Sequence, residues 1–178
     1  MMEVRFQGVG GQGAVTAAEL LAVAAGAEKK YSQAFPFFGV ERRGAPVQSF
    51  CRIDDKPIRV HMRVYNPEIV VVLEKMLVER VDVCAGIEGK KIAIVNSSAP
   101  VKQGFEKADR VYHVDATNIA IRHLGAPIVN TAMLGAVAKA TGLVRLESLE
   151  QAIKERFSPE LAQKNIAAIK ECYETVKE

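Results

Sequence analysis

The first residues of the chain alternate polar and apolar side chains and then reach a glycine. Residues 3–6, Glu-Val-Arg-Phe, therefore predict a short strand. Residues 14–25 are rich in Ala and Leu, which favour a helix, and Gly26 is a residue type that commonly ends one. The glycine-rich run 8–13 lies between them, so this part of the chain predicts the strand, turn and helix that open a βαβ unit.

Further apolar runs predict the remainder of a mostly parallel sheet. Residues 69–73, Ile-Val-Val-Val-Leu, are of the β-branched type that is buried on both faces of such a sheet. Residues 91–95 and 111–114 are shorter strand candidates. Residues 74–81 predict a short helix, and residues 116–124 predict a longer one that a Gly-Ala-Pro sequence stops.

The segment between these two parts interrupts the α/β alternation. Residues 34–46 contain aromatic side chains, glycine and proline, and predict a long loop. Residues 47–53 predict a strand, 54–57 a turn and 58–64 a returning strand. The sequence thus predicts a β-hairpin insertion around residues 47–64.

The last third of the chain predicts helices. Asn130 can cap a helix that runs to residue 140, with Gly142 behind it. Ser158, Pro159 and Glu160 predict the start of a further helix with an apolar stripe, formed by Ala162, Ile166, Ile169, Tyr173 and Val176. The whole pattern predicts one domain over residues 1–178, of class α/β: a Rossmann-like, mostly parallel sheet flanked by helices, with a hairpin insertion and a helical C-terminal third.

Composition and charge exclude several classes of protein. Apolar residues make up 49% of the 178 residues, which excludes a disordered chain, and a net charge of +3 gives no reason to expect a nucleic-acid partner. No apolar run approaches the roughly 20 residues that cross a bilayer, so no membrane partner is expected. Cys51, Cys84 and Cys172 lie far apart without a C-x-x-C motif, which argues against a metal or cluster held by this chain alone. An odd cysteine count without a secretory signal predicts a cytoplasmic protein.

The glycine run has the spacing of a phosphate-binding loop. Gly8, Gly10 and Gly13, with Gly11 between them, satisfy G-x-G-x-x-G after a strand and before a helix, where unpaired amide groups can meet an anion. A dinucleotide site also needs an acidic residue about 20 positions later, and residues 31–34 contain none. Three interpretations stay open: an NAD or NADP site, a site for another phosphate or anion, and a tight turn that packs against another chain.

A second candidate feature is the pair Arg42 and Arg43 in the loop. Paired guanidinium groups bind carboxylates and phosphates in a bidentate manner, although a solvated loop or a salt bridge between subunits would look the same. The neighbouring aromatic residues Phe35, Phe37 and Phe38 favour cover by a partner.

Residues 130–135, Asn-Thr-Ala-Met-Leu-Gly, place a polar residue ahead of a helix whose small residues Gly135 and Ala136 would let another backbone approach. No catalytic motif accompanies these features. His61, His113 and His123 have no suggestive neighbours, and the chain carries neither a nucleophile elbow, a zinc-protease motif, a P-loop nor a thiamine diphosphate signature.

Three segments together carry a resemblance to a known family. They are Gly-Val-Gly-Gly-Gln-Gly at 8–13, Phe-Pro-Phe-Phe-Gly with Glu-Arg-Arg-Gly-Ala-Pro-Val at 35–47, and Ile-Val-Asn-Thr-Ala-Met-Leu-Gly at 128–135. In this order they resemble the gamma subunits of the 2-oxoacid:ferredoxin oxidoreductase family, along nearly the whole chain. The Glu-Arg-Arg-Gly-Ala-Pro form resembles the pyruvate type. One departure is Glu-Lys-Met at 74–76, where the family pattern leads us to expect a turn-like segment.

The resemblance implies a function for the assembly to which the chain belongs. Such a complex decarboxylates pyruvate on thiamine diphosphate, passes electrons through 4Fe–4S clusters to ferredoxin and forms acetyl-coenzyme A. It implies that partner subunits, named alpha, beta and delta, hold the thiamine diphosphate and the clusters, and that this chain is an accessory subunit without catalytic residues. The alternative is a free-standing Rossmann-like module that binds a nucleotide or anion.

We further predict that the two loops form one surface, because the exits of parallel strands lie at the same edge of a sheet. Coenzyme A or a partner carboxylate would bind there. The residues of this predicted site are Gly8, Gly10, Gly11, Gly13, Arg42, Arg43 and Asn130.

Overall fold

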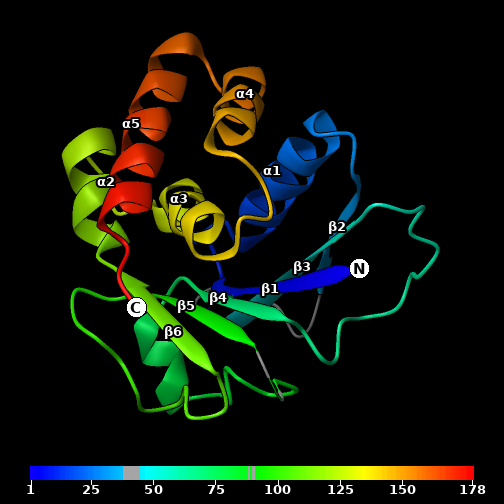
Figure 1. The fold of residues 1–178 in the computed structure, drawn as a ribbon. Coiled ribbons are helices and arrows are strands. Elements are labelled where there is room, and N and C mark those ends of the chain that lie inside the picture. Colours follow the sequence, from blue (N-terminus) through cyan, green and yellow to red (C-terminus); the bar gives the residue numbers. More distant parts are fainter. Residues whose placement is uncertain (38–44, 88, 90) are drawn as a thin grey trace.

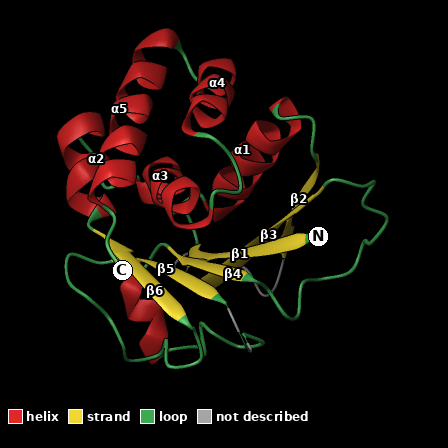
Figure 2. Cartoon of the chain, viewed as in Figure 1, coloured by secondary structure: helices red, strands yellow, loops and turns green. Residues whose placement is uncertain are grey.

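The chain folds into a six-stranded sheet with its larger helices on one face, as Figure 1 and Figure 2 show. The computed structural model describes residues 1–37, 45–87, 89 and 91–178. The strands are β1 (Met2–Val9), β2 (Tyr31–Phe37), β3 (Pro46–Asp54), β4 (Ile69–Val72), β5 (Ile92–Asn96) and β6 (Arg110–Val114). The helices are α1 (Ala14–Ala27), α2 (Ala116–Leu124), α3 (Val129–Thr141), α4 (Leu146–Arg156), α5 (Pro159–Thr175) and the 3₁₀ helix η1 (Lys75–Glu79).

The strand order is β2-β3-β1-β4-β5-β6, and it confirms the predicted α/β class. β1, β4, β5 and β6 are parallel, whereas β3 is antiparallel to both of its neighbours. The connection after β1 leads through α1 to one side of the sheet, and the chain after β4 continues to the other side. The carboxyl ends of β1 and β4 therefore flank the point where a doubly wound sheet offers a crevice for ligands.

The predicted strand at residues 47–53 is confirmed as β3, but the hairpin predicted over residues 47–64 pairs it with the wrong segment. The hairpin is formed by β2 and β3, so residues 34–37, which were expected in a loop, belong to a strand. Residues 58–64 form no strand. The physical reason is that β1 and β2 occupy both edges of β3 and leave no edge for a returning strand. Pro36 is tolerated because β2 is the edge strand, where a missing amide group costs little.

The helical layer is organised around α3, which lies between the sheet and α5 in Figure 1. Residues 129–138 are all buried, so this stretch of the helix has no solvent-exposed face. The predicted close approach at Gly135 is confirmed, and the approaching backbone is that of α5: a Cβ atom on Gly135 would lie 2.0 Å from the carbonyl oxygen of Ile169. The apolar stripe of α5 is consequently part of the core of this chain, with Ala162 and Ile169 fully covered.

The opposite face of the sheet has a smaller apolar core under η1 and the loops around it. Next to this core, β1 and β3 carry polar side chains, among them Arg5, Gln7, Gln48 and Arg52. Residues 55–66, which we call the strap, cross this polar part: the guanidinium group of Arg52 donates to the carbonyl oxygens of Val60 and Met62 at 3.2 and 2.5 Å. Among the helices of the described segments, none combines the length and the apolar character that a membrane crossing needs.

Candidate functional site

The glycine loop, residues 8–13, joins β1 to α1 at the crevice between β1 and β4. Gly11 and Gly13 have φ angles of 94° and 77°, a region that side chains with a Cβ atom rarely adopt. A Cβ atom on Gly8 would lie 2.9 Å from Oε1 of Gln12, so this glycine leaves room for the glutamine side chain. Gly11 and Gly13 are thus required by the fold of the loop itself, whatever the loop binds.

Some of the amide groups in this loop already have partners. The amide of Gly10 donates to the carbonyl oxygen of Ala45 at 3.0 Å, and that of Gln12 donates to Val9 at 3.0 Å. Oε1 of Gln12 in turn accepts a hydrogen bond from the Val9 amide at 2.9 Å. These groups cannot also bind an anion, so a bound anion would have to meet the remaining amides of the loop and of the first turn of α1.

Gln12 also links the loop to the end of β4. Its Nε2 donates to Oε2 of Glu74 at 3.2 Å, and Oε1 of Glu74 accepts from the amide of Met76 at 3.1 Å, which caps η1. A cavity of about 320 Å³ adjoins this contact and is lined by Val9, Glu74, Met76, Leu77 and Arg80. The carboxylate of Glu74 disfavours an anion directly beside it, because like charges repel at short distance, although Arg80 brings a cation to the same cavity.

Sequence reasoning assigned no role in the site to Gln12 or Glu74. Gln12 occupies a variable position of the glycine motif, and Glu74 belongs to the Glu-Lys-Met departure at residues 74–76. The usable signal for Glu74 was its place directly after a buried strand, since the carboxyl ends of parallel strands gather at one edge.

Asn130 lies against the glycine loop rather than capping its own helix. The residue before α3 is Ile128, and no side chain caps this helix. Asn130 instead sits in the first turn, only 7% exposed, with Nδ2 donating to the carbonyl oxygen of Gly13 at 3.4 Å. Its Oδ1 is buried and has no partner in the described parts of the chain. The structure therefore brings Asn130 and Gly13 together and leaves one buried acceptor unsatisfied beside the loop, an arrangement that calls for an explanation.

Arg42 and Arg43 lie outside the described residues, and only the chain on either side of them can be placed. Phe37 ends β2, and Ala45 binds Gly10 directly before β3 begins. β2 runs in the same direction as β1, because both are antiparallel to β3. The segments on either side of the two arginines thus lie at the same end of the sheet as the glycine loop, where β1 and β2 end and β3 begins.

The other candidate chemical groups are in separate parts of the fold. His113 is buried on β6, where burial and the nearby Lys177 lower its pKa. His123 on α2 contacts Oε2 of Glu171 at 2.6 Å, and His61 is on the strap. In the segments that the structure places, no group of three His, Cys, Asp or Glu side chains could hold a metal ion. None of the histidines is part of the glycine loop.

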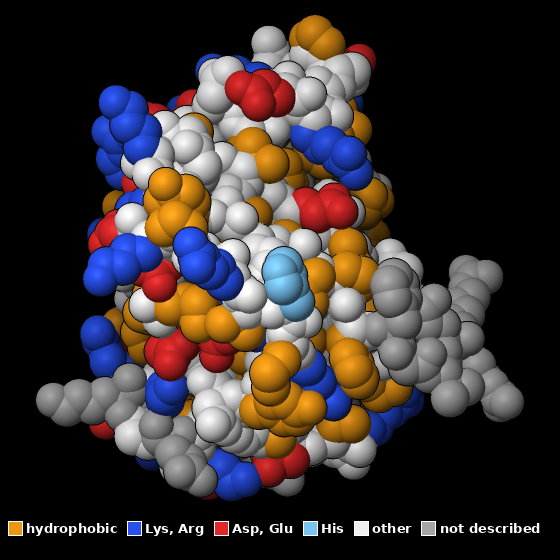
Figure 3. All heavy atoms as spheres, turned by 90° about the vertical axis from the view of Figure 1, so that its right-hand side faces the viewer, with side chains coloured by type: hydrophobic (Ala, Val, Ile, Leu, Met, Phe, Trp, Pro, Cys, Tyr) orange, Lys and Arg blue, Asp and Glu red, His pale blue; other side chains and the backbone are white. Residues whose placement is uncertain are grey.

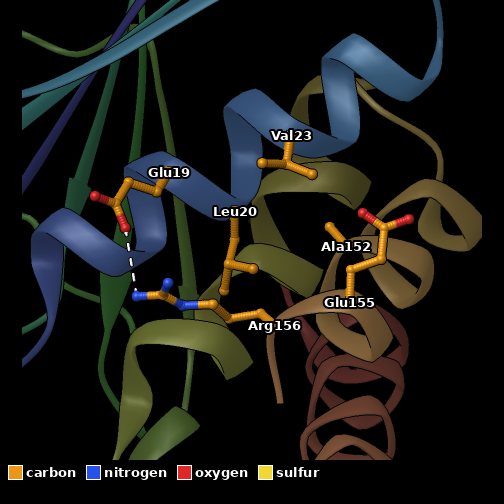
Figure 4. A pocket seen from close by; sticks show the side chains of 6 residues that line it. All are labelled: Glu19, Leu20, Val23, Ala152, Glu155 and Arg156. Carbon is orange, nitrogen blue, oxygen red and sulfur yellow. Dashed lines mark ion pairs between the residues drawn. The ribbon is translucent and has the colours of Figure 1, made fainter.

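A further hollow of about 410 Å³ lies between α1 and α4 on the helical side of the molecule. Figure 4 shows Leu20 and Ala152 in it, with Glu19 and Arg156 facing one another as an ion pair at 3.8 Å. An ion pair and aliphatic side chains supply no nucleophile, so this groove is not a candidate catalytic site.

Comparison with known proteins gives matches along nearly the whole chain. Residues 3–175 match the family model described as pyruvate ferredoxin/flavodoxin oxidoreductase. The common gamma subunit of the pyruvate/ketoisovalerate oxidoreductases of Pyrococcus furiosus is 58% identical over 178 residues, covering 98% of this chain and 96% of the relative. The pyruvate synthase subunit PorC of Methanothermobacter thermautotrophicus is 54% identical and covers 99% and 97%.

A solved structure agrees with these sequence matches. The crystal structure of a pyruvate oxidoreductase subunit from Thermotoga maritima superposes with a TM-score of 0.87 at 38% identity, covering 99% of this chain and 97% of that chain. The family match over residues 3–175 spans the glycine loop, Arg42, Arg43 and Asn130 in sequence.

Proposed function

The chain belongs to the pyruvate ferredoxin/flavodoxin oxidoreductase family, and from this premise we propose that it is the gamma subunit of a complex with alpha, beta and delta subunits that oxidises pyruvate. The complex converts pyruvate to acetyl-coenzyme A and CO₂ and passes the electrons to ferredoxin. The observation that carries the proposal is the 58% identity across 98% of the chain to a gamma subunit that serves pyruvate and ketoisovalerate oxidoreductases. This chain would contact ferredoxin only indirectly.

We place thiamine diphosphate and the 4Fe–4S clusters in the partner subunits. The three cysteines are free thiols on separate elements and are all buried. Burial raises the pKa of Cys51 and Cys172 to about 12 and that of Cys84 to about 11. Thiols that are held neutral and apart do not fit a cluster, which needs several thiolates around one site. Free thiols also support a cytoplasmic location.

Coenzyme A is the ligand that we assign to the predicted surface. The buried Oδ1 of Asn130 beside Gly13 supports a ligand donor at this point, and the arginine segment would supply positive charge for a phosphate group. The carboxylate of Glu74 disfavours a phosphate on the β4 side. We therefore expect the phosphate at the first turn of α1, with Arg42 and Arg43 as candidate partners and groups of a partner subunit completing the site.

The isolated chain is expected to show no pyruvate-dependent reduction of a viologen dye, even with coenzyme A and thiamine diphosphate added. Co-expression with the alpha, beta and delta subunits should restore turnover. The measurement is the rate of dye reduction for the purified chain and for the purified complex. Turnover by the chain alone would disprove the accessory role, and nucleotide binding by a stable monomer that never joins the complex would favour the free-standing module.

Replacing Arg43 by alanine is expected to raise the Michaelis constant for coenzyme A in the assembled complex. The loss of one charge-assisted hydrogen bond corresponds to about 1.5–3 kcal/mol, or roughly 10- to 150-fold. Arg156→Ala is the matched control, because Arg156 pairs with Glu19 on the helical side, in the groove of Figure 4. An unchanged Michaelis constant and unchanged subunit affinity for Arg43→Ala would remove this residue from the site.

A further inference from the structure

The strap exposes large apolar side chains to solvent instead of burying them in the core. Met62 is 65% exposed, Tyr65 63% and Val60 39%, and Phe37 at the end of β2 is 38% exposed. Figure 3 views the side of the molecule with β2 and the strap, and hydrophobic side chains gather there among basic ones. Met, Tyr, Phe and Arg are the residue types enriched in the cores of protein interfaces, so this surface, which we call the strap face, has the composition of a docking site.

The strap face also carries a net positive charge. The strap, residues 55–66, contains Lys56, Arg59, His61 and Arg63 and one acidic residue, Asp55 at its start. Within the described segments, none of these side chains takes part in an ion pair. The positive charge of this surface is therefore available to an acidic partner.

Arg63 shows how such a partner could be recognised. Its guanidinium carbon lies 4.1 Å from the ring centre of Phe37 and 5.7 Å from that of Tyr65, and Nη2 donates to Gln48 at 3.2 Å. Aromatic contacts hold the guanidinium group in one orientation, which favours its pairing with a carboxylate of a partner.

The backbone of the strap is held in place before any partner arrives. Arg52 is 1% exposed and binds the carbonyl oxygens of Val60 and Met62, so the two carbonyl groups face the sheet. The Met62 side chain nevertheless projects into solvent. A surface fixed in this way loses little conformational entropy on binding, which favours affinity.

We propose that the strap face docks an acidic segment of another subunit of the complex, with apolar residues covering Met62 and Tyr65 and carboxylates pairing with Arg59 and Arg63. This inference rests on the proposed function, which supplies the partner subunits. A second copy of this chain is a poorer occupant, because a self-complementary interface would bring the same cations together.

The test is a competition for incorporation into the complex. Wild-type and variant chains are expressed together with the alpha, beta and delta subunits, and their ratio in the purified complex is measured by mass spectrometry relative to their soluble abundance. Met62→Glu and Arg59→Glu should each be under-represented by about tenfold or more, and Arg59→Gln by less. The control is Val23→Glu, which changes an exposed residue on α1 and should be incorporated like the wild-type chain.

The outcomes separate the two proposals. Equal incorporation of both strap variants overturns the docking face and leaves the proposed function intact. A deficit for Met62→Glu alone, with Arg59→Glu incorporated normally, overturns the acidic character of the partner. If the wild-type chain itself never enters the complex, the proposed function fails.

Discussion

Replacing Gly135 by alanine is expected to lower the free energy of unfolding by about 3 kcal/mol, which is a large share of the stability of a domain of this size. The added methyl group would lie 2.0 Å from the carbonyl oxygen of Ile169, and backbone atoms of α5 cannot turn aside as a flexible side chain can. The two helices would have to separate, which would loosen the core around α3. The measurement is chemical unfolding monitored by circular dichroism.

Gly26→Ala is the matched control. Gly26 also lies in a helix, but a Cβ atom there would meet nothing nearer than Oγ of Ser32 at 3.9 Å. Alanine should therefore leave the protein unchanged or stabilise it by about 0.5–1 kcal/mol through its higher helix propensity. If both substitutions had the same effect, the close contact between α3 and α5 would not limit what position 135 accepts.

Replacing Arg52 by alanine is the second substitution for which we expect a large effect, again about 3 kcal/mol of unfolding free energy. Arg52 is buried and donates from Nε to Oε1 of Glu3 at 2.7 Å, so its removal leaves the Glu3 carboxylate without its cation. It also frees the carbonyl oxygens of Val60 and Met62, which hold the strap. Trypsin should therefore cleave the strap of the variant faster than that of the wild-type chain, at Arg59 or Arg63.

Two further variants serve as comparisons for the effect of Arg52→Ala on stability and on cleavage of the strap. Arg52→Lys keeps the positive charge beside Glu3 but lacks the fork that reaches both strap carbonyls, so we expect partial stability together with accelerated cleavage. Arg110→Ala removes an exposed arginine whose ion pair with Glu178 is solvated, and it should change the unfolding free energy by about 0.5 kcal/mol or less. A stable Arg52→Ala variant with normal resistance to trypsin would show that the strap is anchored elsewhere.

The fold could be predicted wherever local pattern and burial agree. The apolar run at 69–73 corresponds to β4, because a strand covered on both faces must be apolar throughout, and the shorter runs near 91–95 and 111–114 correspond to β5 and β6. The helix over residues 116–124 has its predicted limits, since Asp115 and Gly125 are effective local start and stop signals. The prediction of a loop over residues 34–46 was wrong for residues 34–37, because Pro36 and its aromatic neighbours are typical of loops. Pro36 can belong to β2 only because β2 is an edge strand of the sheet.

The glycines of the candidate site could be predicted from the sequence, but the side-chain contacts of the site could not. G-x-G-x-x-G after a strand indicates the turn by local stereochemistry, and Gly11 and Gly13 do have positive φ. Asn130 was assigned a capping role because the chain order places it ahead of a helix, whereas packing turns its side chain toward Gly13, 117 positions away. The Gln12–Glu74 contact likewise joins residues 62 positions apart, which no local motif can indicate.

The sequence by itself determined the α/β class, the glycine turn, the helical last third and the family resemblance, because each depends on local periodicity or on an ordered set of short motifs. Only the tertiary structure decided which strands pair with β3 and which helix packs closely against Gly135, namely α5. It also decided that Arg52 holds the strap against the sheet. These features depend on contacts between distant segments. Their free energy comes from burial, and from hydrogen bonds that form only when the sheet and the helical layer are assembled.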